Sequence, residues 1–285
     1  MAEAPSLLFA SAMTLDQLPP LRDTLAEHGL LAKKSFGQHF LLDLNITRKI
    51  ARLAQVGPGD HVIEVGPGPG GLTRALLETG ARVTAVEADP RFAPLLEELS
   101  AASGGALTLR LEDALTTDEA AVAAGQPAHM VSNLPYNVGT PLLIKWLTGP
   151  FTPASMTLMF QKEVADRVAA EPGSDAYGRL SVIAQATSHA QVVMDVPARA
   201  FTPPPKVTSA VVRLTPLADR PEPARLDALQ TITAAAFGQR RKMLRSSLKV
   251  LGGEALCEAA GVPPEARAET IDIEGFLALA DAWRR

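Results

Sequence analysis

Short runs of apolar residues alternate with longer, more polar segments through the middle of the chain. The apolar runs have the length of strands and cover residues 61–65, 82–87, 106–111, 128–132, 156–160 and 207–214. Segments with helical spacing of apolar residues lie between them, at 72–78, 90–99 and 141–147. Strands that alternate with helices are typical of a parallel sheet built from βαβ units, so we predict an α/β fold with a Rossmann-like sheet.

The pattern changes after Leu214. Pro216, Pro221 and Pro223 interrupt a polar stretch, which is typical of a linker. Beyond the linker the chain carries helical patterns and no convincing strand. We therefore predict two domains, an α/β domain over residues 1–215 and a small all-helical domain over residues 216–285.

Composition indicates a globular protein. Of the 285 residues, 47% are hydrophobic and 20% are charged, which excludes a mostly disordered chain. The only cysteine, Cys257, cannot form an internal disulfide, which points to a reducing compartment. The sequence indicates no signal peptide and no membrane-spanning segment, so we expect a cytoplasmic protein with no membrane partner.

Charge is distributed unevenly along the chain. The net charge of −4 by itself argues against a nucleic-acid partner. Residues 228–253, however, contain no acidic side chain and carry a group of basic ones, namely Arg240, Arg241, Lys242, Arg245 and Lys249. A second basic stretch, residues 33–52, has one acidic residue, Asp43, against Lys33, Lys34, Arg48, Lys49 and Arg52. Each stretch is either a phosphate-binding patch or a solvated helix face.

A glycine-rich turn at residues 66–71 follows the first predicted strand and opens the first predicted helix. Glycine lets the backbone approach a ligand closely and leaves the helix N-terminus free to face it. The turn satisfies G-x-G-x-x-G, and Glu87 ends the next strand 21 residues after Gly66. A carboxylate at that spacing is suited to bind a ribose hydroxyl pair, so we expect a cofactor that contains a nucleoside, with NAD among the candidates.

Two features argue against NAD. Pro67 and Pro69 remove backbone donors that a pyrophosphate would use. Asp113 follows the third predicted strand and brings a second carboxylate to the same sheet edge as Glu87. Its side chain can accept a hydrogen bond from an adenine amino group, or it can cap a helix N-terminus. With Glu87 in the same cleft, we favour the contact with a ligand.

The fourth predicted strand leads directly into Asn133, Leu134, Pro135 and Tyr136. An aromatic amine is a poor nucleophile because its lone pair is delocalised into the ring. The side-chain oxygen of Asn133 and the carbonyl of Leu134 can accept its two N–H groups and direct the lone pair at an electrophile. Pro135 would fix the turn, and Tyr136 can stack on a flat base. The alternative is an ordinary Asn–Pro turn with a half-buried tyrosine.

Six separated segments resemble those of a known protein family. They are 34–41 (KSFGQHFL), 64–68 (EVGPG), 133–136 (NLPY), 161–167 (QKEVADR), 201–209 (FTPPPKVTS) and 236–242 (AFGQRRK). Together they resemble the class I S-adenosylmethionine-dependent methyltransferases, and among these the rRNA adenine N6,N6-dimethyltransferases of the bacterial small subunit. The segments span most of the chain in the family's order, which is more specific than any single motif.

The resemblance implies S-adenosyl-L-methionine as the cofactor, bound by residues 1–215. Its methionine part would lie against the turn of Gly66 and Gly68, its ribose against Glu87 and its adenine against Asp113. Asn133 would contact both the cofactor and the target amine.

Two further parts of the chain would complete the site in this resemblance. Residues 39–41, including His39 and Leu41, would close over the cofactor. The family often has Asn at the position of His39, whose imidazole can also donate or accept a hydrogen bond. Phe201 would form the second face of a sandwich around a flipped adenine, opposite Tyr136. Apart from the resemblance, Phe201 is best interpreted as a core phenylalanine.

The resemblance also implies the partner, 16S rRNA in the small ribosomal subunit or its precursor, with two adjacent adenosines near the 3′ end each dimethylated. Residues 216–285 would bind the RNA phosphates through Arg240, Arg241, Lys242 and Arg245, with Lys33, Lys34, Arg48 and Lys49 as weaker candidates. The histidines show no metal-ligand spacing, so no metal is expected. We expect the protein to act as a monomer.

Four other functions share some of these features. A nicotinamide dehydrogenase would share the glycine turn but leaves residues 133–136 unexplained. A DNA adenine methyltransferase would share the amine chemistry, whereas the basic C-terminal segment and residues 201–209 favour RNA. A large-subunit resistance methyltransferase is closely related, and residues 161–167 and 236–242 favour the small-subunit enzyme. A non-enzymatic ribosome assembly factor could keep the fold and lose the chemistry, but the presence of Asn133 and Tyr136 argues against that loss.

Overall fold

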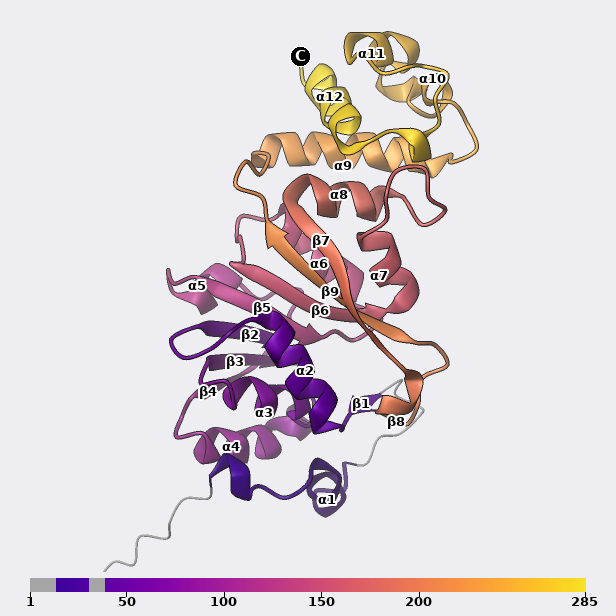
Figure 1. Ribbon diagram of the computed structural model, residues 1–285. Coiled ribbons are helices and arrows are strands. Elements are labelled where there is room, and N and C mark those ends of the chain that lie inside the picture. Colours follow the sequence, from indigo (N-terminus) through magenta and orange to yellow (C-terminus); the bar gives the residue numbers. More distant parts are fainter. Residues whose placement is uncertain (1–13, 31–38) are drawn as a thin grey trace, which may run out of the picture.

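Seven strands form one sheet in the computed structural model, which describes residues 14–30 and 39–285 (Figure 1). They are β2 (His61–Val65), β3 (Arg82–Glu87), β4 (Leu107–Leu111), β5 (Ala128–Asn133), β6 (Ser155–Gln161), β7 (Ser188–Val196) and β9 (Ser209–Pro216). Their spatial order is β4-β3-β2-β5-β6-β9-β7. Strands β2 to β6 run parallel, and β9 is antiparallel to both of its neighbours. The predicted α/β fold is confirmed.

Helices cover both faces of the sheet because successive strand residues point to opposite sides. In β2, Val62 belongs to one buried apolar cluster and Ile63 to another. The first cluster is closed by α2 (Leu44–Ala54), α3 (Gly71–Leu77) and α4 (Ala93–Ala102). The second is closed by α5 (Glu119–Ala123), α6 (Gly139–Thr148), α7 (Lys162–Val168) and α8 (Arg179–Thr187).

The chain beyond the sheet is helical. A third apolar cluster joins Val182 of α8 to Leu229 and Phe276, and it also buries Cys257. The helices are α9 (Pro223–Gly238), α10 (Leu244–Ser247), α11 (Gly253–Ala259) and α12 (Ile273–Trp283), which lie together at one end of the molecule (Figure 1). Because α8 contributes to both the second and the third cluster, the helical part is continuous with the α/β part, and a domain boundary at residue 215 stays a prediction.

Short elements complete the described chain. A two-stranded antiparallel pair lies outside the main sheet and consists of β1 (Phe40–Leu41) and β8 (Phe201–Thr202). The remaining elements are α1 (Leu21–Glu27), η1 (Leu15–Gln17), η3 (Pro90–Phe92), η4 (Ala198–Ala200), η5 (Lys249–Leu251) and η6 (Ala268–Thr270). Among the described residues, no helix is both long and apolar enough to cross a membrane.

All six predicted strands are present, and the differences lie at the ends and edges. The last one lies two residues later than predicted, at Ser209–Pro216, so the connection to α9 is shorter than expected. Strand β7 and helices α1, α2, α5, α7 and α8 were not predicted. β7 is an edge strand with a bulge between Val192 and Met194, and several of its side chains reach solvent, so it lacks a continuous apolar run.

Candidate active site

The sheet opens at its middle, between β2 and β5. The two strands are paired only from His61, opposite Ala128, to Ile63, opposite Met130. The strand that follows β2 pairs on one side of this opening, and the strand that follows β5 pairs on the other side. Across the opening, the hydroxyl of Ser132 donates a hydrogen bond to the carbonyl of Val65. Ligands of open α/β sheets bind beyond the carboxyl ends of the strands at such a switch point.

A cavity of about 590 Å³ lies at this opening, a volume within the range of small-molecule sites. Ten of the predicted site residues line it, namely His39, Leu41, Gly66, Gly68, Glu87, Asn133, Leu134, Pro135, Tyr136 and Phe201. The structure thus brings together residues from five separate segments of the chain. The lining also includes Glu64, Asp89 and Phe92, to which the sequence analysis assigned no role.

The glycine turn adopts a backbone that side chains would obstruct. Gly66 and Gly68 have φ angles of 65° and 53°, in the left-handed region. A Cβ on Gly66 would lie 3.2 Å from Cγ of Pro135, so the glycine turn and the residues after β5 are in close contact. The missing side chain of Gly66 therefore leaves this wall of the cavity as bare backbone.

Glu87, at the end of β3, is held by the backbone around it. Its Oε2 accepts a hydrogen bond from the amide of Gly68 at 3.0 Å, and its Oε1 accepts one from the amide of Asp89 at 2.8 Å. Burial raises the pKa of Glu87, and these two hydrogen bonds oppose the rise. The carboxylate is thus oriented at the mouth of the glycine turn, where a ribose was predicted.

Glu64 is the least expected residue of the lining. It is 1% exposed, and among the described residues its Oε2 has no hydrogen-bond partner. Burial, together with the nearby carboxylate of Glu87, raises the pKa of Glu64 to about 8. An unpaired buried carboxyl oxygen in a cavity suits a ligand that carries hydrogen-bond donors or positive charge. S-adenosylmethionine carries both, so these residues fit it. The sequence feature that could have identified Glu64 as a site residue is its position at the start of the E-V-G-P-G run.

The turn after β5 is braced against helix α6 and strand β9. The carbonyl of Pro135 accepts hydrogen bonds from the amides of Val138 and Gly139, at 3.1 and 3.0 Å. The hydroxyl of Tyr136 lies 2.8 Å from Oγ of Ser209, and burial raises the pKa of that phenol. Asn133 ends β5, opposite Met159 of β6. Its side chain thus stands on a rigid strand end rather than on a free loop.

The pair β1 and β8 covers the cavity. Leu41 is opposite Phe201 in this pair, and Nδ1 of His39 donates to the carbonyl of Pro203 at 2.7 Å. The ring of His39 lies 6.2 Å from that of Tyr136, measured between centroids. Phe201 is 2% exposed and belongs to the first apolar cluster while also lining the cavity. The core interpretation of Phe201 and the site interpretation are therefore compatible.

Asp113 lies beside the cavity rather than in its lining. The strands place it close to Glu87, since Leu111 is opposite Glu87 and the amide of Glu112 donates to the Glu87 carbonyl at 3.0 Å. Oδ1 of Asp113 accepts a hydrogen bond from the amide of Leu115 at 2.9 Å within a turn, whereas the N-cap of the next helix, α5, is Asp118, so Asp113 is not the helix cap considered as the alternative. The contact with a cofactor adenine stays a prediction.

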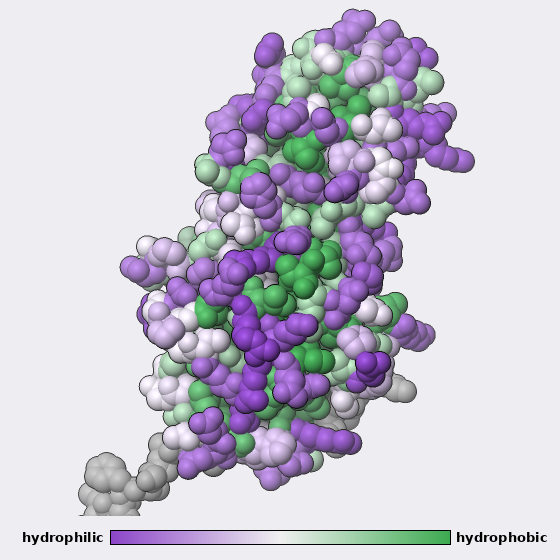
Figure 2. Space-filling model, in the orientation of Figure 1, coloured by the Kyte–Doolittle hydropathy of each residue, from purple (hydrophilic) through white to green (hydrophobic). Residues whose placement is uncertain are grey.

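The predicted RNA-binding side chains lie at the surface of the C-terminal part of the chain. Arg240, Arg241, Lys242 and Arg245 are all exposed. Arg240 donates to the carbonyl of Asp175 at 2.8 Å, and Arg245 lies 3.8 Å from Glu265. In Figure 2, hydrophilic residues rim the end of the molecule where the C-terminal helices lie. Their role in RNA binding stays a prediction.

The second basic stretch differs. Arg48 forms an ion pair of 2.6 Å with Glu78, so much of its charge is already balanced. Lys33 and Lys34 lie outside the described residues, as does most of the segment 34–41. In residues 14–30 and 39–285, no group of three or more His, Cys, Asp or Glu side chains is arranged to hold a metal ion.

Comparison with known proteins identifies relatives over nearly the whole chain. The family model of ribosomal RNA adenine dimethylases matches residues 29–284. A protein of Phenylobacterium zucineum named ribosomal RNA small subunit methyltransferase A is 77% identical over 271 residues, which cover 95% of each chain. A protein of Caulobacter vibrioides with the same name is 72% identical over 252 residues, or 88% of this chain and 97% of that one.

Solved structures of similar fold include two enzymes that modify adenosine or rRNA by name. A dimethyladenosine transferase from Plasmodium falciparum has a TM-score of 0.72 and 26% identity, over 85% of this chain and 96% of that one. The 23S rRNA methyltransferase ErmE has a TM-score of 0.66 and 29% identity, over 86% of this chain and all of that one.

Proposed function

This chain belongs to the ribosomal RNA adenine dimethylase family, and on that premise we propose that it dimethylates the N6 amines of two adjacent adenosines near the 3′ end of 16S rRNA. It is an S-adenosylmethionine-dependent rRNA adenine dimethyltransferase. The observation that carries the proposal is the position of Asn133, which ends β5 in the same cavity as the glycine turn and Glu87.

The chain's own residues would prepare the amine. Bound S-adenosylmethionine supplies the electrophilic methyl group. Asn133 and the carbonyl of Leu134 accept the two N–H groups of the adenine amine and aim its lone pair into the cavity. Tyr136 stacks on the base, and its hydroxyl bond to Ser209 at 2.8 Å sets the ring plane. The nitrogen loses its proton readily once it is alkylated, so a strong general base is not required.

Three features support the cofactor assignments within the site. The glycine turn offers bare backbone to the methionine part, and the buried Glu64 oxygen offers an acceptor. Glu87 is oriented by the amides of Gly68 and Asp89, which suits a carboxylate that accepts from ribose hydroxyls. We assign the adenine contact to Asp113, in the turn next to Glu87. His39 and Leu41 close the site through the β1–β8 pair.

The small-subunit target rests on the relatives. Proteins named small subunit methyltransferase A are 77% and 72% identical to this chain, whereas the 23S rRNA enzyme is 29% identical. We propose that the substrate is the small subunit or its precursor, that the enzyme acts as a monomer in the cytoplasm, and that Arg240, Arg241, Lys242 and Arg245 bind RNA phosphates.

Transfer of labelled methyl from S-adenosylmethionine tests the proposal. Unmethylated small subunits, large subunits and duplex DNA are compared, and the product is identified after digestion to nucleosides. We expect dimethyladenosine from small subunits alone, with two labelled sites that are adjacent near the 3′ end. Label in large subunits would contradict the target, and absence of label with the cofactor bound would indicate an assembly factor.

A further inference from the structure

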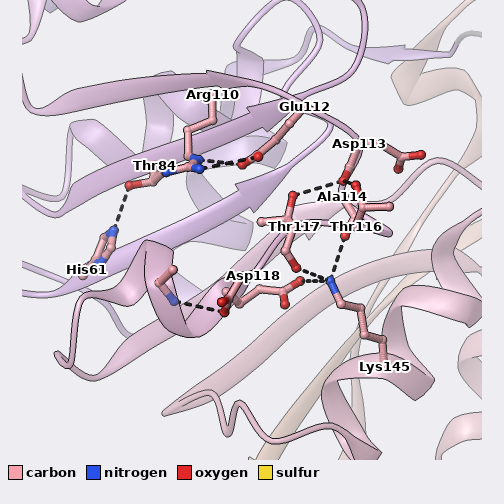
Figure 3. Close-up of polar contacts among 12 residues, drawn as sticks. His61, Thr84, Arg110, Glu112, Asp113, Ala114, Thr116, Thr117, Asp118 and Lys145 are labelled. Carbon is pink, nitrogen blue, oxygen red and sulfur yellow. Dashed lines mark hydrogen bonds and ion pairs between the residues drawn. The ribbon is translucent and has the colours of Figure 1, made fainter.

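Lys145 reaches from helix α6 to the turn that carries Asp113 (Figure 3). Its Nζ donates to the carbonyl of Ala114 at 3.0 Å, to the carbonyl of Thr117 at 2.5 Å and to Oε1 of Glu119 at 2.8 Å. A lysine ammonium has three N–H donors, so these acceptors use all of them. Lys145 therefore has no N–H donor left for water.

The ion pair at the centre of these contacts is largely shielded from water. The side chain of Glu119 is 5% exposed and that of Lys145 is 29% exposed. Oε1 of Glu119 also accepts a hydrogen bond from the indole of Trp146 at 2.8 Å. Loss of one partner of a shielded pair leaves the other charge uncompensated, so the two side chains hold each other in one geometry.

Few other contacts among the described residues hold the turn of residues 113–117 against the rest of the protein. The carbonyl of Asp113 accepts from the amides of Thr116 and Thr117 at 3.0 and 3.1 Å, which closes a compact turn. Asp113 and Leu115, in contrast, are exposed, and of the turn only Ala114, which packs in the second apolar cluster, and Thr117 are buried. Lys145 binds the carbonyls of those same two residues.

Helix α6 connects this contact to the methyl-transfer motif. Its first turn is tied to the carbonyl of Pro135 by the amides of Val138 and Gly139. Lys145 follows within the same helix, which spans Gly139–Thr148. Helix α6 and the side chain of Lys145 therefore connect residues 133–136 to the Asp113 turn directly, in addition to the connection through strands β3 and β4.

We propose that Lys145 is a positioning residue. It holds the Asp113 turn on helix α6, so that the cofactor adenine at that turn and the methyl acceptor at residues 133–136 are both positioned by the same helix. The inference rests on the proposed contact between Asp113 and the adenine amine. It adds a residue that lies outside the cavity lining and outside every motif identified in the sequence.

The test uses two ligands that differ at one edge of the base, S-adenosylhomocysteine, which has an amine at C6, and S-inosylhomocysteine, which has an oxo group at C6 and a proton on N1. For the full-length Lys145→Met variant we expect binding of S-adenosylhomocysteine to weaken about tenfold by calorimetry. Binding of the inosine analogue should change much less, so the preference for adenine falls. At saturating cofactor, kcat should stay within about threefold of the parent, because the acceptor motif is intact. Lys162→Met is the matched control, since Lys162 pairs with Asp166 and Asp195 away from the cavity.

Coupling to Asp113 separates positioning from general damage. If Lys145 acts through Asp113, the double variant with Asp113→Ala should bind no worse than Asp113→Ala alone. Equal weakening of both ligands with additive effects would overturn the inference, as would parent-like affinity and preference in Lys145→Met. If Asp113→Ala keeps the full preference for adenine, the proposed role of Asp113 is wrong and so is the inference about Lys145. The proposed function is tested separately, by methyl transfer to small subunits. Should Lys145→Met not fold, Glu119→Gln removes the charge partner of Lys145 and is expected to lower the preference for adenine by a smaller factor, because Lys145 keeps the carbonyls of Ala114 and Thr117.

Discussion

Polar groups are arranged in opposite ways in two parts of the molecule. One part is the cavity at the β2–β5 opening, and the other is the basic segment of residues 240–245, which lies before and within α10. In the cavity, Glu64 and Glu87 are 1% and 7% exposed, and backbone amides orient Glu87. In the segment, Arg241 and Lys242 are exposed. The first arrangement is preorganised for a few short contacts, and the second acts through summed charge. Single changes should therefore be severe in the cavity and small in the segment.

The largest effect is expected at Asn133. Asn133→Ala removes the acceptor that holds the target amine, so methyl transfer should fall by at least about 10³-fold while cofactor affinity stays within about tenfold. Single-turnover transfer to small subunits and calorimetry with S-adenosylhomocysteine measure the two quantities. Asn45→Ala, an exposed asparagine on α2, is the control. Unimpaired turnover of Asn133→Ala would remove the assigned role.

A smaller loss is expected at Tyr136. Tyr136→Ala removes a stacking surface worth about 1–3 kcal/mol, so kcat/KM for RNA should fall by about 10- to 100-fold. Tyr136→Phe keeps the ring and loses only the bond to Ser209, so it should stay within about tenfold of the parent. If the two variants were equally impaired, the hydroxyl rather than the ring would be the functional group.

The basic segment should respond in a graded, salt-dependent way. Replacement of Arg240, Arg241 and Lys242 by Ala should weaken RNA binding by about tenfold near physiological salt and flatten the slope of log K against log salt by about two. Binding is measured as a salt titration with an RNA fragment of the substrate.

The control for this triple variant removes three exposed arginines of the α/β part, Arg22, Arg82 and Arg110. That control should keep the parent slope. An unchanged slope in the C-terminal triple variant would return the segment to a solvated helix face and erase the contrast with the cavity.

The smallest effect concerns stability and comes from Glu64. Its pKa of about 8 in the folded chain lies above the ordinary 4.5, so between these values the folded state retains a proton that the unfolded state has lost. The free energy of unfolding therefore falls as pH rises through this window. Glu64→Gln removes the titration and should be more stable than the parent by about 1–2 kcal/mol at pH 8, with little difference near pH 5.

Urea unfolding of the free protein at the two pH values measures this difference. Glu97→Gln, at an exposed position of α4, serves as the control and should show no such pH-dependent gain. A gain of the same size for Glu64→Gln at both pH values would mean that the carboxylate is not the titrating group.

Much of the α/β part was predictable because its strands are buried on both faces. Runs such as 61–65 and 128–132 are mostly apolar, with few polar residues within them, and the glycine turn follows a strand at a recognisable spacing. Strand β7 was missed because an edge strand exposes alternate residues and carries no continuous apolar run. Helix α7 was missed because its seven residues include several charges.

The residues of the site also divide into those that could be predicted from the sequence and those whose role depends on the tertiary structure. The residue types in N-L-P-Y, the glycine turn and Glu87 determine which chemistry is available, and this was evident from their order along the chain. The role of Glu64 depends on burial, which raises its pKa and leaves one oxygen unpaired. Oδ1 of Asp113 accepts a hydrogen bond from the amide of Leu115, a contact that only the tertiary structure shows, and the predicted contact of this side chain with the cofactor adenine stays a prediction.

By itself the sequence determined the order of six strands of the sheet and of helices α3, α4 and α6, the kind of cofactor loop and the groups that can hold an aromatic amine. Only the tertiary structure decided which of these groups meet. It brought residues 39–41 and 201 together as a cover, tied Tyr136 to Ser209 and joined Lys145 to the Asp113 turn. The physical reason is that local patterns reflect propensity and periodicity, whereas contacts between distant segments depend on strand register and on the burial of charge once the core has closed.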